Sequence, residues 1–237
     1  MMKLENLVTE LVQIKNTELQ GNETNPIENI LQLVGKELIT KCQIIIGNIV
    51  IEPLWLEAYY YNACMGFMDP FAHRDPKQMN HYGQLYFHHK TDDQRSGVDI
   101  CLSLSNEYYL SYLLKYTLVN GEFTTQAALS KKIRSAYEQY GCEVVIKTFT
   151  STEQDIVGYT ERIGLVVKNT DENKNEKELY KSLNLAIVKN FNVKYNGRKK
   201  LPQIEKLADS YLASYEGNKE EECKRILGYC RSQYRGK

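Results

Sequence analysis

The sequence lacks the features that mark a membrane or secreted protein. No stretch is continuously apolar over the roughly 18 residues that a membrane-spanning helix requires. The chain begins Met-Met-Lys-Leu-Glu-Asn and continues into an acidic amphipathic pattern, not into the apolar core of a signal sequence. These absences predict a cytoplasmic protein.

The sequence also lacks net charge, because 30 Lys and Arg residues balance 30 Asp and Glu residues. Proteins that coat nucleic acid are usually strongly basic, so the balance argues against that class but leaves room for a local basic patch. The six cysteines include no CxxC pair, which favours buried free thiols. The 18 tyrosines are the unusual feature, since a ring that packs and a hydroxyl that hydrogen-bonds suit half-buried faces and binding clefts.

Hydrophobic spacing predicts a strand-rich centre flanked by helices, with no internal repeat and no linker. This order is typical of one α+β domain over residues 1–237. Gly35 is expected to end the second helix, and Pro53 to mark a bulge or an edge position. The predicted helices cover residues 4–12, 26–34, 124–140, 204–215 and 223–234. The predicted strands cover residues 38–46, 49–61, 85–88, 98–104, 108–118, 142–149 and 162–167. Residues 168–177 are expected to form a loop, and only helices are expected after it.

All four histidines lie between His73 and His89, among several acids and amides. Three interpretations stay open. The first is a metal site, since imidazole and carboxylate are common ligands, although no HxxxH or HxH pair is present and the adjacent His88 and His89 would point to opposite faces of a strand. In the second, the histidines are half-buried, hydrogen-bonded members of a tyrosine-rich sheet. In the third, they line a pocket for a nucleobase.

A series of short motifs favours the third interpretation. The motifs are Val-Gly-Lys-Glu-Leu at 34–38, Glu-Ala-Tyr at 57–59, Asp-Pro-Phe-Ala-His at 69–73, Gly-Gln-Leu-Tyr-Phe-His at 83–88, Gly-Val-Asp-Ile at 97–100, Leu-Leu-Lys-Tyr at 113–116, Ser-Lys-Lys-Ile at 130–133 and Arg-Ile-Gly-Leu at 162–165. In this order the series resembles the alkyladenine (3-methyladenine) DNA glycosylase family. The resemblance covers roughly residues 27–190 and implies a curved, mainly antiparallel central sheet flanked by helices, as in that family and in the formyltransferase C-terminal domain, with residues 191–237 as a helical extension.

The resemblance implies a hydrolase of base excision repair, which removes a damaged or modified purine from DNA by cutting its N-glycosidic bond. Glu57 stands at the position of the carboxylate that activates water and stabilises the sugar cation. Lys115 stands where the family has an Arg beside that water. The residues alone leave Glu57 open to a solvent-facing role, although its place between Trp55 and Tyr59 on one face of a strand also fits a cleft wall. No metal or organic cofactor is implied.

The resemblance also implies how a base turned out of the helix is held. Tyr59 and His73 would stack on one face of the base, and His88, or Tyr86 if the alignment slips, on the other. Asp99 would read the base edge, where the family has an Asn.

The partner is expected to be single- or double-stranded DNA, or a nucleotide. The family's wedge Tyr has no counterpart in the polar stretch 89–96, which weakens the case for duplex DNA. The candidate contacts to the nucleic-acid backbone are Lys131, Lys132, Arg198, Lys199 and Lys200.

Three other functions stay open. One is a module on the same fold that binds a nucleotide or modified base without cutting it. Another is a metal-dependent hydrolase built on the histidines. The last is a protein–protein adaptor that uses the tyrosine-rich sheet and the C-terminal helices.

Overall fold

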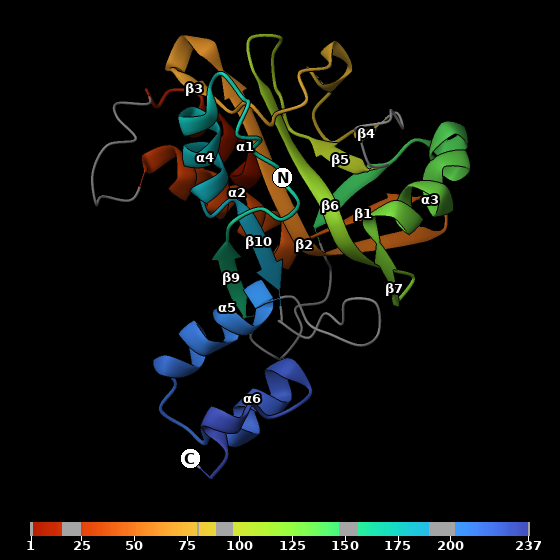
Figure 1. Ribbon diagram of the computed structural model, residues 1–237. Helices are drawn as coiled ribbons and strands as arrows, with labels where there is room; N and C mark the ends of the chain where they lie inside the picture. Colours follow the sequence, from red (N-terminus) through yellow and green to blue (C-terminus); the bar gives the residue numbers. More distant parts are fainter. Residues whose placement is uncertain are drawn as a thin grey trace.

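The fold is built on one antiparallel sheet, which curls into a half-barrel (Figure 1). The computed structural model describes residues 2–15, 25–79, 81–88, 97–146, 156–189 and 202–236. Within these residues the chain forms a single α+β domain with ten strands and six α-helices. The predicted α+β class and the antiparallel pairing are therefore confirmed.

The six strands of the main path run in the order β4-β5-β6-β2-β1-β8, while β7 pairs with β6, β3 and β10 pair with β2, and β9 pairs with β10. The strands are β1 (Cys42–Ile46), β2 (Ile49–Asn62), β3 (Phe67–Met68), β4 (Leu85–Phe87), β5 (Val98–Cys101), β6 (Tyr109–Val119), β7 (Glu122–Thr125), β8 (Glu143–Ile146), β9 (Val157–Thr160) and β10 (Ala186–Lys189). The helices are α1 (Met2–Leu11), α2 (Pro26–Lys41), α3 (Gln126–Tyr140), α4 (Lys174–Ser182), α5 (Pro202–Ala213) and α6 (Lys219–Leu227).

The long strand β2 organises both faces of the sheet. Its side chains at Leu56, Ala58 and Tyr60 are buried in the main core, together with side chains of α1, α2 and α3. Trp55 points away from that core and packs in a second cluster with residues of α5 and α6. Figure 1 shows these two helices at the end of the molecule that holds the C-terminus. Pro53 coincides with a shift in the register between β2 and β6, so the predicted bulge is confirmed.

One row of paired residues crosses the sheet on the face opposite the main core. Tyr86 pairs with Asp99, Asp99 pairs with Leu113, and Leu113 pairs with Glu57. Directly paired residues of neighbouring strands point to the same face, so four strands project these side chains toward one region.

The prediction that Gly35 ends a helix is wrong, because α2 continues through it to Lys41. A Cβ at Gly35 would lie 2.7 Å from the side chain of Ile187 on β10 and 3.1 Å from the ring of Tyr112 on β6. Gly35 therefore lets α2 pack closely on the sheet, and the strand predicted from residue 38 begins only at Cys42.

The predicted strand at 162–167 is also wrong, since β9 ends at Thr160 and the chain that follows is irregular. Strands β3, β7, β9 and β10 and helix α4 are not among the predicted elements. The last predicted helix ends at Leu227, where Gly228 has φ of 74°. The predicted strand at 142–149 is described only as far as Ile146.

All six cysteines are free, as predicted, but Cys64 is exposed. Among the described residues no helix has the length and apolar character needed to cross a membrane.

Candidate active site

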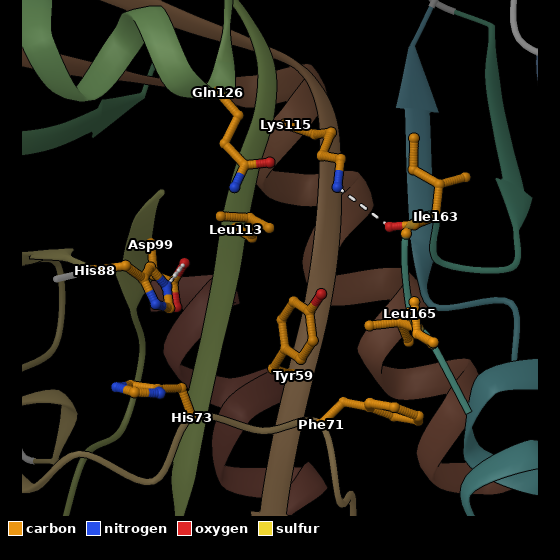
Figure 2. Close-up of a pocket in the computed structure, with 12 residues that line it drawn as sticks. Tyr59, Phe71, His73, His88, Asp99, Leu113, Lys115, Gln126, Ile163 and Leu165 are labelled. Atoms are coloured by element: carbon orange, nitrogen blue, oxygen red, sulfur yellow. Dashed lines mark hydrogen bonds and ion pairs between the residues drawn. The ribbon is translucent and has the colours of Figure 1, made fainter. Parts of the chain in front are cut away.

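A cavity of about 430 Å³ opens on the face of the sheet that carries this row of paired residues. Figure 2 shows β2 and β6 behind the cavity, the 69–75 loop below it, and the irregular segment after β9 at one side. The residues that line it are Tyr59, Phe71, His73, His88, Asp99, Leu113, Lys115, Gln126, Ile163, Gly164, Leu165 and Val166. Five of the seven residues that the sequence assigns to catalysis and base binding are in this lining.

Glu57 lies behind the cavity wall and is fully buried. Its Oε2 accepts hydrogen bonds from the Tyr59 hydroxyl and from Lys115 Nζ, each at 3.2 Å. Its Oε1 accepts from the backbone N–H of Ile163 at 3.0 Å. An ionised carboxylate accepts up to about four hydrogen bonds, so three of the positions on Glu57 are occupied.

Lys115 connects Glu57 to the cavity. Its ammonium forms an ion pair with Glu57 and also donates to the carbonyl oxygen of Ile163 at 3.3 Å, a contact drawn in Figure 2. A buried carboxylate is costly unless it is paired, and Lys115 supplies the pairing charge. The positive end of the pair therefore faces the cavity, and the negative end lies behind it.

Tyr59 is held from behind by a buried ion pair between Arg162 and Asp69. The Arg162 guanidinium lies 4.8 Å from the centre of the Tyr59 ring and also donates to the carbonyl oxygens of Ala58 and Tyr180. Burial would lower the pKa of Arg162, but the charge of Asp69 raises it on balance. Burial and the nearby Glu57 raise the pKa of Tyr59 well above its ordinary value, so its hydroxyl stays protonated and can donate to Glu57.

Asp99 and His88 form a second charged pair at the opposite side of the cavity. His88 Nε2 lies 2.9 Å from Asp99 Oδ1, while Asp99 Oδ2 accepts from Gln78 Nε2 and from Ser111 Oγ, each at 2.9 Å. Burial alone would lower the pKa of His88, but the charge and hydrogen bond of Asp99 raise it above its ordinary value. The dyad thus favours the imidazolium form of His88.

His73 is oriented by a chain of hydrogen bonds. The Tyr86 hydroxyl donates to Asp75 Oδ2 at 2.7 Å and lies 2.9 Å from His73 Nε2. Burial would raise the pKa of Asp75, but the N–H of Lys77 and the Tyr86 hydroxyl lower it on balance. Since Tyr86 uses its only proton on Asp75, its oxygen accepts from Nε2–H of His73.

The structure does not support the predicted stacking arrangement in detail. The ring centres of His73 and His88 are 5.1 Å apart, too close to hold a base between them, which needs roughly twice the contact distance of about 3.5 Å. Both histidines therefore lie on one wall. Tyr86 lies behind them and does not line the cavity.

The candidate contacts to the nucleic-acid backbone are not brought to the cavity. Lys131 and Lys132 are exposed on α3, and Lys132 forms an ion pair with Glu122 at 2.9 Å. Arg198, Lys199 and Lys200 lie outside the described residues.

Several parts of the site were not assigned from the sequence. Ile163 contributes backbone groups, which no side-chain motif reveals, and Arg162 acts from behind the wall. In the sequence Gln78 is only one of several acids and amides near the histidines, and a lone serine on a strand, such as Ser111, has many possible roles. Within the part of the chain that the structure describes, no group of three or more His, Cys, Asp or Glu side chains could hold a metal ion.

No protein-family model matches this sequence, and no curated protein matches it significantly. The resemblance to the alkyladenine DNA glycosylases therefore rests on the ordered motifs alone.

Proposed function

We propose that this protein binds a purine base in the cavity and hydrolyses the N-glycosidic bond that joins the base to its sugar, as a DNA-repair glycosylase does. We also propose that the curled antiparallel sheet is arranged as in the alkyladenine DNA glycosylases. The observation that carries it is the cavity itself: the flat rings of Tyr59, His73 and His88 surround it, with the Lys115–Glu57 ion pair in its wall.

The cavity suits a base rather than a large ligand. A volume of about 430 Å³ lies in the lower part of the range found for small-molecule sites. Tyr59 and Phe71 belong to one side and the two histidines to another (Figure 2), so a planar ligand meets aromatic faces on more than one side. Stacking of a base on such rings is worth about 1–3 kcal/mol per base.

The ion pair provides the chemistry. A water beside Lys115 attacks C1′ of the sugar, the C1′–N bond breaks, and its electron pair leaves with the base. The proton lost by the water passes to the Tyr59 hydroxyl, while that hydroxyl gives its own proton to Glu57 Oε2. The departing base takes a proton from solvent, unless alkylation has already made it cationic. The negative charge of Glu57 stabilises the sugar cation that develops.

The proposed substrate is DNA in which the target base is already accessible, with single strands as the preferred form. A base in a duplex must first be turned out of the stack at a cost of a few kcal/mol. The chain has no net positive charge that would offset this cost through phosphate contacts. Among the proposed backbone contacts that the structure describes, Lys131 is exposed on α3.

One observation favours a second candidate, a module that binds a base without cutting it. Glu57 is fully buried and already accepts three hydrogen bonds, so it also fits the role of holding Tyr59, Lys115 and Ile163 in place. In that case the pocket would bind purines and release no product.

An excision assay tests the proposal. The full chain is incubated with single- and double-stranded oligonucleotides that carry hypoxanthine, ethenoadenine or 3-methyladenine, and abasic sites are scored. Abasic product, formed faster on single strands, is the expected result. Binding of the same oligonucleotides without product on any of them would replace the glycosylase with the binding module.

A further inference from the structure

A second row of paired side chains lies beyond the cavity on the same face of the sheet. Tyr61 on β2 pairs with Met68 on β3 and with Tyr109 on β6, so all three side chains point to one face. Side chains two positions apart along a strand share a face and are about 7 Å apart, which places Tyr61 next to Tyr59 in the cavity wall. The row is therefore one side-chain spacing away from the proposed base site.

This second row is accessible from outside the protein. Met68 is 42% exposed, and Tyr61 and Tyr109 are each half-buried. The two tyrosine rings lie edge to face, with centres 6.3 Å apart and an angle of 74° between their planes. In contrast, Tyr60 and Tyr112 on the opposite face are fully buried in the main core. Exposed aromatic surface beside a cavity is where a ligand that extends out of the cavity would lie.

Arg74 adds a positive charge to this row. Its guanidinium lies 4.9 Å from the centre of the Tyr61 ring, and the residue is exposed. Within the residues that the structure describes, no acid is recorded as an ion-pair partner of Arg74. Arg74 also follows His73, which lines the cavity, so one short segment contributes to both places. A guanidinium in this position can hold a phosphate with its N–H fork while its plane rests on an aromatic ring.

We propose that Tyr61, Tyr109 and Arg74 form a subsite for the nucleotide next to the target base in a single strand of DNA. This inference rests on the proposed function, since it says how the DNA beyond the target base is held. The neighbouring base stacks on the tyrosine rings, and a phosphate beside it pairs with Arg74. Every base has a flat aromatic face, so the subsite accepts any neighbouring base.

Such a subsite favours single strands over duplex DNA. In a duplex the adjacent base pairs already cover both faces of the neighbouring base, so this base must leave the stack before it can meet a protein ring. In a single strand the same base turns onto the rings at a lower cost. The proposed preference for single strands then has a cause that does not depend on the net charge of the chain, which is zero.

The test is binding of short fluorescent single-stranded oligonucleotides to the full chain, followed by anisotropy. The central hypoxanthine nucleotide carries a 2′-fluorine, which destabilises the sugar cation and so prevents cleavage during the measurement. Two further oligonucleotides replace the neighbouring nucleotide on the 5′ or on the 3′ side by an abasic residue, which keeps the phosphate. Wild-type protein is expected to bind one of these two at least about fivefold more weakly than the intact oligonucleotide.

Variants separate a subsite from a merely structural role. Tyr61→Leu/Tyr109→Leu removes both rings and should bind the intact oligonucleotide at least about fivefold more weakly, with no further loss when the neighbour is abasic. Arg74→Gln should reduce the slope of log K against log salt concentration by about 0.7, the value for one phosphate contact of a single strand. Tyr140→Leu, at a tyrosine that is 62% exposed on α3, is the matched control and should bind like wild type.

Binding of free hypoxanthine, measured by calorimetry on each protein, distinguishes this inference from the proposed function. All variants are expected to keep the wild-type affinity for it, since none of the substituted residues lines the cavity. Equal binding of the intact and both abasic oligonucleotides by wild-type protein, or an unchanged affinity of the double variant, would overturn the subsite and leave the base pocket standing. Wild-type protein that binds neither free hypoxanthine nor the intact oligonucleotide would overturn both proposals.

Discussion

Lys115 Nζ lies 3.2 Å from Glu57 Oε2, and the two side chains differ in what they show to the cavity: Lys115 is 13% exposed and Glu57 is not exposed at all. The pocket thus presents a cation to its ligand and holds the matching carboxylate one layer behind. A fully buried carboxylate without its counter-charge costs more free energy than a partly exposed ammonium without its own, so the fold relies on Lys115 to keep Glu57 ionised and buried.

Removal of the cation is expected to destabilise the fold. Lys115→Met leaves the Glu57 carboxylate buried without its counter-charge and should lower the free energy of unfolding by about 3–5 kcal/mol, measured by urea denaturation. The matched control is Lys132→Met, which breaks an exposed Lys–Glu pair with Glu122 and should have little effect. Adding Glu57→Gln to Lys115→Met should recover part of the loss, and strictly additive effects would argue against the pairing.

The guanidinium of Arg162 is expected to be irreplaceable by an ammonium. Arg162→Lys keeps the charge beside Asp69, but it cannot supply the fork that also reaches the carbonyls of Ala58 and Tyr180, and it loses the planar contact with the Tyr59 ring. The variant should unfold at a lower urea concentration and should bind purines more weakly. Unchanged binding by the variant would mean that Tyr59 does not need this support.

Replacement of Gly35 by alanine is expected to destabilise the fold, although alanine favours helices. The gain in helix propensity is about 1 kcal/mol, while overpacking against Ile187 and Tyr112 costs about 1–3 kcal/mol. Gly35→Ala should therefore lower stability on balance, and Ile187→Val in the same chain should restore part of it. A Gly35→Ala protein more stable than wild type would show that α2 can move away from the sheet.

The features that the sequence does not predict share one physical cause. Spacing along the chain predicted β2, its bulge at Pro53 and the nearness of Tyr59 to Glu57, because those features are local. Gly35 was misread because its role is set by β10, a strand far along the chain that was itself not predicted. Contacts between distant segments decide such positions, and a single sequence does not display them.

The same limit applies to the site. The candidate residues Tyr59, His73, His88, Asp99 and Lys115 do meet around one cavity, with Glu57 behind it. Their partners could not be assigned, because the pairing of His88 with Asp99 depends on how β4 lies beside β5. That pairing changes the expected role of Asp99: its carboxylate orients His88 instead of contacting the base edge.

The His88–Asp99 pair is expected to make stability depend on pH. Because the folded pKa of His88 is raised, the stability it contributes is fully present below about pH 6.5, the ordinary histidine value, and is lost as the pH rises through the folded pKa. The loss of unfolding free energy caused by His88→Gln should thus be larger at about pH 5.5 than at about pH 8.5. His81→Gln, at an exposed histidine, is the control. A larger loss at high pH would contradict the raised pKa.

Cleavage of a glycosidic bond in the pocket is proposed to depend on Glu57. Its most direct test is single-turnover release of hypoxanthine from a single-stranded oligonucleotide by wild-type protein and by Glu57→Gln, with binding of free hypoxanthine measured on both. We expect release by wild-type protein and a loss of at least about a hundredfold in Glu57→Gln, with binding retained. No release by wild-type protein, or equal release by both, would contradict it.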